Sequence, residues 1–154
     1  MPISDLEIAK RQLRKRGFSL VIAKDGKIIF ETRQSGVSGF LKAIDEFGKR
    51  GLAGSSIADR VVGRAAAMLC VFCGVKAVNA VILSKGGKEL LEENGVSFQF
   101  ESLVPNILNR QQTGVCPFEK IVATISNAEE AYEKLKTCIN ETGKSTKGHQ
   151  ASCR

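Results

Sequence analysis

Residues 57–73, IADRVVGRAAAMLCVFC, form the stretch from which we interpret the fold. Its only polar side chains belong to Asp59, Arg60 and Arg64, in the first half of the run, and the rest is apolar. A helix of this composition is buried on nearly all sides. We therefore predict a buried central helix over residues 57–73. Its polar first turns, with Gly63 allowing a close approach, mark a candidate site.

The length and composition around this stretch predict one domain. The chain has 154 residues, of which 43% are hydrophobic, enough for a single core. We place the domain at residues 1–141 and predict a disordered basic tail at 142–154, which contains the single histidine, His149. No apolar run is long enough to span a membrane, and the first residues lack the apolar centre of a signal peptide. We expect a cytoplasmic protein, and the odd number of cysteines, five, favours reduced thiols.

The formal charge of +7 is unevenly distributed. Five basic residues crowd the first predicted helix: Lys10, Arg11, Arg14, Lys15 and Arg16. No aromatic residues that could stack on bases are interleaved with them. We therefore favour a solvated helix face over a nucleic-acid-binding surface.

The first half of the chain predicts a helix, a hairpin and a second helix. Ser4 and Glu7 form a capping box, and Gly17 ends the helix that follows. The β-rich runs 18–24 and 27–33 are separated by Asp25-Gly26, which suits a type I′ turn. Apolar residues then recur at helical spacing over 40–47, and residues 48–54 supply a break.

The second half predicts a parallel βαβ unit and two further helices. VNAVILS (78–84) has the apolar content of an interior strand, KGGKELLEENG (85–95) of a short helix, and VSFQFES (96–102) of another strand. Pro117 suits the first position of a helix capped by Cys116. Ser126 and Glu129 form a second capping box, which starts a last helix running to about Cys138.

This order of elements resembles the cytidine-deaminase-like fold, an α/β three-layer αβα sandwich whose mixed sheet contains an N-terminal hairpin and a parallel βαβ unit. Deaminases bind zinc through a His or Cys followed two residues later by Glu, and through Pro-Cys-x-x-Cys. The corresponding stretches here, DRVVGRAA (59–66) and SKGGK (84–88), contain no Cys, His or Glu. We therefore expect no zinc, no other metal and no cofactor.

Three motifs, DRVVGRAAA, ILSKGG and NRxxTGxCPFEK, are similar to those of a small prokaryotic family of unknown function, a zinc-less relative of the cytidine deaminases. The resemblance extends over about residues 6–138. It implies the fold and a shared pocket, without an assigned activity.

The predicted pocket lies where helix N-termini converge beyond the parallel strands. Lys85, Gly86 and Gly87 have the composition of an anion cradle, and Asp59, Gly63 and Arg64 would lie in the same region. Asn109, Arg110 and Thr113 would add polar contacts. The alternative for residues 85–88 is an ordinary turn that enters a surface helix.

Cys116 is a candidate nucleophile because a thiol at a helix N-cap has a lowered pKa. Glu119 could then act as an acid or base. The alternative is that Cys116 only caps the helix, since no histidine is available in the fold as its base. Cys70 and Cys73 are spaced as a C-x-x-C pair, but their apolar surroundings favour buried thiols over a redox pair or a metal site.

Two functions follow from this sequence. One is an enzyme without zinc that binds a small anionic ligand, nucleotide-like or phosphorylated, and carries out a transfer or hydrolysis that depends on Cys116. The other is a non-catalytic module that senses such a ligand. We rank nucleic-acid binding third and expect no membrane association. The oligomeric state is left open.

Overall fold

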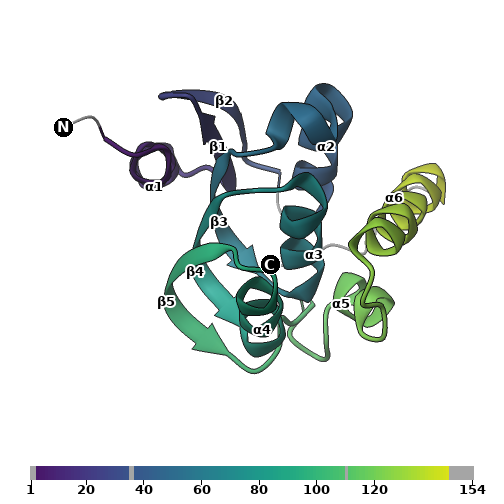
Figure 1. Ribbon diagram of the computed structural model, residues 1–154. Helices are drawn as coiled ribbons and strands as arrows, with labels where there is room; N and C mark the ends of the chain where they lie inside the picture. Colours follow the sequence, from purple (N-terminus) through teal and green to yellow (C-terminus); the bar gives the residue numbers. More distant parts are fainter. Residues whose placement is uncertain (1–2, 35–36, 110, 146–154) are drawn as a thin grey trace.

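The computed structural model describes residues 3–34, 37–109 and 111–145 (Figure 1). The helices are α1 (Asp5–Arg16), α2 (Val37–Leu52), α3 (Arg64–Cys73), α4 (Lys85–Glu93), α5 (Pro117–Val122) and α6 (Ala128–Ser145). The strands are β1 (Leu20–Lys24), β2 (Lys27–Thr32), β3 (Ser56–Val62), β4 (Ala77–Ser84) and β5 (Ser97–Val104). They form one five-stranded mixed sheet in the order β2-β1-β3-β4-β5.

The first helix and the hairpin form as the sequence predicts. The backbone N–H of Glu7 donates to Ser4 Oγ at 3.2 Å, and Gly17 ends α1 in the left-handed conformation at φ 68°. Asp25 (φ 53°) and Gly26 (φ 84°) both have the positive φ that a type I′ turn requires. The Asp5 carboxylate accepts from the backbone N–H groups of Asp25, at 3.1 Å, and Gly26, at 2.8 Å. We call this arrangement the Asp5 clamp, and it ties the start of α1 to the hairpin turn.

The parallel part of the sheet consists of β3, β4 and β5. β4 has a parallel neighbour on each side, and Val78, Ala80 and Leu83 along it are buried, which confirms the predicted interior strand and βαβ unit. β1 is antiparallel to both of its neighbours. Because parallel crossovers are right-handed, the consecutive order β3-β4-β5 places α3 and α4 on the same face of the sheet.

Helices flank the sheet on both faces (Figure 1). On one face, Ala9 and Leu13 of α1 pack on Val21, Ala23 and Ala58 in a small cluster. On the other face, α2, α3 and α4 enclose the larger core. The last two helices, α5 and α6, contact the outer side of α3 (Figure 1).

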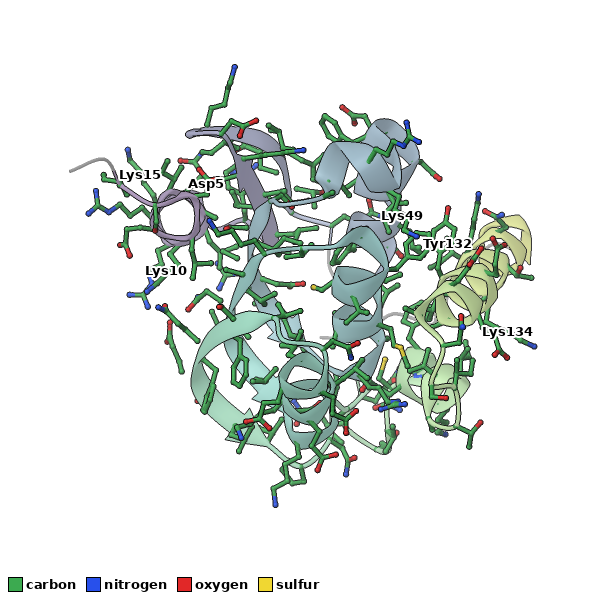
Figure 2. All side chains as sticks on the ribbon, viewed as in Figure 1. Asp5, Lys10, Lys15, Lys49, Tyr132 and Lys134 are labelled. Carbon is green, nitrogen blue, oxygen red and sulfur yellow. The ribbon has the colours of Figure 1, made fainter. Side chains whose placement is uncertain are left out.

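An aromatic pair helps to join α6 to this assembly. The rings of Phe72, on α3, and Tyr132, on α6, stack with centroids 4.4 Å apart and planes 11° from parallel. Lys49 Nζ lies 4.8 Å from the Phe72 ring centroid and Lys136 Nζ lies 5.5 Å from that of Tyr132 (Figure 2). Apolar stacking and cation–π contacts therefore connect α2, α3 and α6.

The predicted central helix over 57–73 is wrong in its first third. Residues Ser56–Val62 form β3, which pairs antiparallel with β1 and parallel with β4, and the helix begins only at Arg64. The apolar content of a strand covered on both faces is the same as that of a buried helix, so composition alone does not separate them. The β-branched residues Ile57, Val61 and Val62 favour the strand, and Gly63 marks the change of structure.

Two other helix boundaries differ from the prediction. The helical backbone of α2 is interrupted at Gly48 (φ 73°, ψ 169°), as predicted, but a further helical stretch follows and ends at Leu52, inside the predicted break. The last helix is capped by Asn127, whose Oδ1 accepts from the Glu130 N–H at 2.9 Å, and not by Ser126. It continues past Cys138 to 145, four residues into the segment predicted to be disordered. The rest of that tail, with His149, lies outside the described residues.

Candidate functional site

The N-termini of α3 and α4 lie side by side at the carboxyl ends of two parallel, paired strands, β3 and β4. A Cβ atom on Gly87 would lie 3.0 Å from the backbone carbonyl of Gly63, and one on Gly86 would lie 3.8 Å from Arg64 Cβ. A contact of 3.0 Å leaves no room for a larger residue at position 87. The structure thus brings together four of the predicted site residues, Gly63, Arg64, Gly86 and Gly87.

A carboxylate from α5 occupies the N-terminus of α3. Glu119 Oε1 accepts from the backbone N–H of Arg64 at 2.8 Å, and its Oε2 accepts from that of Ala65, also at 2.8 Å. We call this arrangement the Glu119 clamp. A Cβ on Gly63 would lie 2.5 Å from Glu119 Oε1, so the clamp depends on glycine at this position. The positive end of the α3 dipole is therefore satisfied by the protein's own anion.

The Arg64 side chain, on α3, in turn binds backbone carbonyls near the end of α5. Its Nε donates to the carbonyl of Val122 at 3.0 Å and its Nη2 donates to that of Ile125 at 2.6 Å. These carbonyls lie at the end of α5 and just beyond it, where a helix leaves acceptors without partners. Arg64 and Glu119 therefore act as a pair that docks α5 on the N-terminus of α3.

Burial raises the pKa of the half-buried Glu119 above its usual value. The N–H groups of Ala65 and Arg64 and the Arg64 charge act in the opposite direction. Hydrogen bonds to a charged carboxylate favour its ionised form, whereas removal from water disfavours it. The desolvation of Glu119 raises its pKa by more than its hydrogen bonds and the Arg64 charge lower it.

Asp59 lies apart from this pair, within β3, where it pairs with Leu20 of β1 and Ala80 of β4. Its Oδ1 accepts from the backbone N–H of Val61 at 3.2 Å. Loss of solvent raises the pKa of Asp59 from 3.8 to about 7, against the effect of its backbone hydrogen bonds. The side chain therefore titrates near neutrality.

Cys70 and Cys73, on α3, are buried and free. Burial, with the nearby Asp59 charge, raises the pKa of Cys70, and burial raises the pKa of Cys73 to about 12. Both side chains are therefore protonated thiols near neutral pH. Across the described residues, no group of three or more His, Cys, Asp or Glu side chains gathers in a way that could hold a metal ion.

Cys116 stands at the N-cap of α5, directly before Pro117, as predicted, but its side chain makes no capping hydrogen bond. It is 1% exposed and engaged in a disulfide bond, so the expectation of reduced thiols does not hold for it. Its backbone N–H donates to the carbonyl of Ile107 at 2.8 Å. A cysteine in a disulfide has no thiolate with which to attack a substrate.

The polar loop before α5 is folded on itself. Asn109 Oδ1 accepts from the Thr113 backbone N–H at 3.0 Å, and Asn109 Nδ2 donates to Thr113 Oγ1 at 3.1 Å. Gln112 closes the turn in the left-handed conformation, with φ 60°. Arg110 lies outside the described residues. Asn109 and Thr113 are thus used to shape the loop.

The start of α4, which carries Lys85 and Lys88, is also capped by a side chain of the same segment. Ser84 Oγ accepts from the Gly87 backbone N–H at 3.0 Å. The Lys85 side chain is exposed, and Lys88 pairs with Glu92 at 3.0 Å. Ser84 is the register partner of Val104 in the β4–β5 ladder. Lys85 therefore stands at the same end of the sheet as the residues that follow β5.

A pocket of about 510 Å³ opens at the carboxyl ends of β3, β4 and β5. Its apolar walls are Val61, Val81, Ile82, Val104, Ile107 and Leu108. Its polar lining residues are Arg60, Asn106 and Gln112. The Arg60 Nε donates to the Phe18 carbonyl at 2.7 Å, and Arg60 forms no ion pair within the described part of the chain.

The pocket and the Glu119 clamp share a wall. Ile107 lines the pocket, and a Cβ on Gly63 would lie 2.6 Å from Ile107 Cγ1. Sequence reasoning missed the pocket's polar residues because it placed Arg60 on a helix and treated the segment after β5 as a plain loop. The rule that ligands bind beyond the carboxyl ends of parallel strands was applied only to the predicted helix starts; applied also to the segment after β5, it would have pointed to Asn106 and Gln112.

The basic face of α1 carries its own acidic partners. Arg11 and Lys10 lie 3.3 and 3.8 Å from the Glu7 carboxylate, and Arg14 pairs with Glu101 of β5. Lys10 also donates to Gln99 Oε1 at 2.9 Å. None of the helices in the described segments has the length and apolar content needed to cross a membrane.

Comparisons with known proteins agree on one family. The model of the domain of unknown function DUF1893, TM1506, matches residues 8–139. The crystal structure of the DUF1893 family protein TM1506 from Thermotoga maritima, at 2.70 Å resolution, is similar with a TM-score of 0.79 and 29% sequence identity. The similarity covers 86% of this chain and 88% of that one. No curated protein matches the chain.

Proposed function

The chain belongs to the DUF1893 family, and we propose that it is a binding module for a small molecule with an apolar body and an anionic group. The ligand would occupy the pocket at the carboxyl ends of β3, β4 and β5. One observation carries this proposal: a pocket of about 510 Å³ with apolar walls has an arginine in its lining. Small-molecule pockets are typically apolar, with a few polar groups that fix orientation, and of this order of size.

Arg60 supports the anionic part of the proposal. Its bond to the Phe18 carbonyl uses Nε and holds the side chain in place, while the guanidinium has further donors for a phosphate or carboxylate. Lys85, exposed at the same end of the sheet, adds positive charge. Asn106 and Gln112 supply amide groups that could bond a polar edge of the ligand. A nucleotide-like or phosphorylated molecule combines these features.

We also propose that the fold is that of the cytidine deaminases without their zinc site. Two observations support this: a hairpin precedes the parallel strands, and the N-termini of α3 and α4 lie together. In zinc deaminases, two motifs at helix starts provide the metal ligands. Here the same places carry Gly63, Arg64, Gly86 and Gly87, packed together with Glu119.

The proposed function assigns no catalytic role to Cys116 or Glu119. The Cys116 sulfur is buried in a disulfide, and both Glu119 carboxylate oxygens accept hydrogen bonds from the backbone of α3. A group that moves a proton in catalysis must reach the substrate. The geometry of these two residues therefore supports a ligand-binding module better than an enzyme.

Thermal denaturation with AMP, adenosine and inorganic phosphate tests the function. AMP should raise the midpoint more than adenosine or phosphate alone, because it fills the apolar pocket and pairs with Arg60. Arg60→Gln should weaken AMP binding about tenfold, which is the loss of one charge-assisted contact. Leu108→Asp, at a residue that is 41% exposed and so tolerates substitution, should weaken it through the pocket wall.

Arg50→Gln is the matched control, since Arg50 is an exposed arginine in the last turn of α2, away from the pocket. It should leave AMP binding unchanged. If AMP gives no shift at millimolar concentration, or if the shift persists in both Arg60→Gln and Leu108→Asp, the proposal is wrong.

A further inference from the structure

The two edges of the sheet are built differently. At one edge, the β1–β2 register shifts between Ile22 and Ala23, an irregularity that bends β2 and disfavours pairing with another strand. At the other edge, β5 pairs with β4 in a constant register from Ser97 to Val104. No strand among the described residues pairs with the outer side of β5. A regular, uncovered edge of this length is a template for another strand.

The open edge also exposes large apolar side chains. Phe100 is 40% exposed and Leu103 is 41% exposed, on opposite faces of β5. The rings of Phe98 and Phe100 are stacked with centroids 6.3 Å apart, so both lie on the face that carries α3 and α4. Natural edge strands usually carry charges, proline or bulges instead. A regular edge that carries the Phe98–Phe100 pair without these protective features favours pairing with another strand.

On the opposite face of β5, which also carries Leu103, the polar residues Gln99 and Glu101 are tied to α1. Lys10 donates to Gln99, and Arg14 pairs with Glu101. This face therefore presents an uncharged amide and a carboxylate two residues apart, with a cation over each. The aromatic pair on one face and the amide–carboxylate pair on the other restrict how a second strand could pair with β5.

We propose that β5 pairs antiparallel with β5 of a second copy of this chain, across a two-fold axis at Phe100. Residues directly opposite each other point to the same face, so this register places Phe100 against its counterpart. It also places Gln99 opposite Glu101 of the partner subunit, close to Lys10. An axis at Glu101 would instead set two carboxylates opposite each other, and an axis further along the strand would leave more of it unpaired.

The resulting interface is isologous, as closed two-fold dimers require. The two five-stranded sheets join into one continuous sheet, and the bulged β2 edges remain at its ends. The proposal concerns the edge of β5 and is independent of whether the pocket binds a ligand.

Sedimentation velocity from about 1 to 100 µM tests the proposal and its register. The wild-type chain should dimerise. Gln99→Glu sets a carboxylate opposite Glu101 of the partner subunit twice per dimer, and should raise the dissociation constant about tenfold. Adding Glu101→Gln to that variant restores an amide opposite a carboxylate and should return the constant close to the wild-type value.

Phe100→Ser should weaken the dimer by about tenfold or more, because it removes the aromatic pair on the axis. Ile3→Ser is the matched control: Ile3 is 46% exposed but lies before α1, away from β5, and its loss should have no effect. A monomer at 100 µM overturns the proposal. So does a dimer that Gln99→Glu and Phe100→Ser leave intact, or one that the double variant does not restore.

Discussion

Two carboxylates in this molecule make the same contact in different surroundings. Asp5 accepts from the N–H groups of two consecutive residues in the hairpin turn, and Glu119 accepts from those of two consecutive residues at the start of α3. The Asp5 clamp lies at the surface, where water can replace the carboxylate. The Glu119 clamp is half-buried between α3 and α5, and burial raises its pKa.

The difference shows that surroundings, more than hydrogen-bond geometry, decide what a contact contributes to stability. A hydrogen bond that water can replace contributes little, whereas a buried donor left without a partner costs the full desolvation penalty. The Asp5 clamp should therefore affect the hairpin turn but contribute little to the stability of the whole domain. The Glu119 clamp should be needed for α3 and α5 to pack.

The largest effect is expected for Glu119→Gln. The amide can accept from one backbone N–H of α3 but turns its own NH₂ toward the other, leaving a buried donor unsatisfied. We expect a loss of about 2 kcal/mol in the free energy of unfolding, measured by urea denaturation. A loss no larger than that of Asp5→Asn would show that burial does not distinguish the two clamps.

Gly63→Ala should lower the free energy of unfolding by nearly as much. The added Cβ would lie 2.5 Å from Glu119 Oε1 and 2.6 Å from Ile107 Cγ1, so the carboxylate or the pocket wall must move. Overpacking of this kind costs about 2 kcal/mol. The control is Gly114→Ala, where an added Cβ meets no atom within 4 Å. Equal urea midpoints for the two alanine variants would contradict the steric argument.

Asp59→Asn tests the effect of burial without a clamp at a helix start or turn, because burial of Asp59 raises its pKa by more than its backbone hydrogen bonds to Val61 and Arg60 lower it. Its pKa is raised from 3.8 to about 7, so the folded state holds the proton while the unfolded state has lost it. Wild-type stability should therefore fall as the pH rises from about 4 to 7. Relative to wild type, the variant should be at least about 1 kcal/mol more stable at pH 8 than at pH 4, by urea titration. A pH-independent difference would contradict this.

The smallest effect is expected for Asp5→Asn, the same carboxylate-to-amide change as Glu119→Gln. The N–H groups of Asp25 and Gly26 stay accessible to water, so we expect a loss of about 0.5 kcal/mol in the free energy of unfolding. The hairpin should remain, because the positive φ angles of its turn are set by Asp25-Gly26 itself. A loss above about 2 kcal/mol would show that the surface clamp matters as much as the buried one.

Local signals in the sequence predicted local structure well. The caps of α1, the Asp25-Gly26 turn and the interior strand β4 are all confirmed. The error at residues 57–62 arose because neighbouring strands, β1 and β4, decide that this segment is extended, and their pairing is not visible in local composition. The predicted break at Gly48 is confirmed by its non-helical φ and ψ, but the further helical stretch that ends at Leu52 was not predicted, because residues 48–54 are rich in glycine and carry no apolar periodicity.

The candidate site was predictable in part. The sequence placed Gly63, Arg64, Gly86, Gly87 and Glu119 near helix starts, and the structure brings them together. It could not show that Arg64 and Glu119 bind backbone groups of each other's helices, because those contacts join distant segments. The pocket lined by Arg60 depends on how the segment after β5 folds back over the sheet, for which the sequence carries no local pattern.

The Glu119 clamp also bears on how the chain is made. Glu119 lies 55 residues after Arg64 and 54 after Ala65, so α3 emerges from the ribosome well before the group that caps it. Contacts of such separation slow folding, since the loop between them must close first. A nascent chain that ends before Glu119 would hold β3 and α3 with uncapped donors. We therefore expect the domain to become protease-resistant only after α5 has been synthesised.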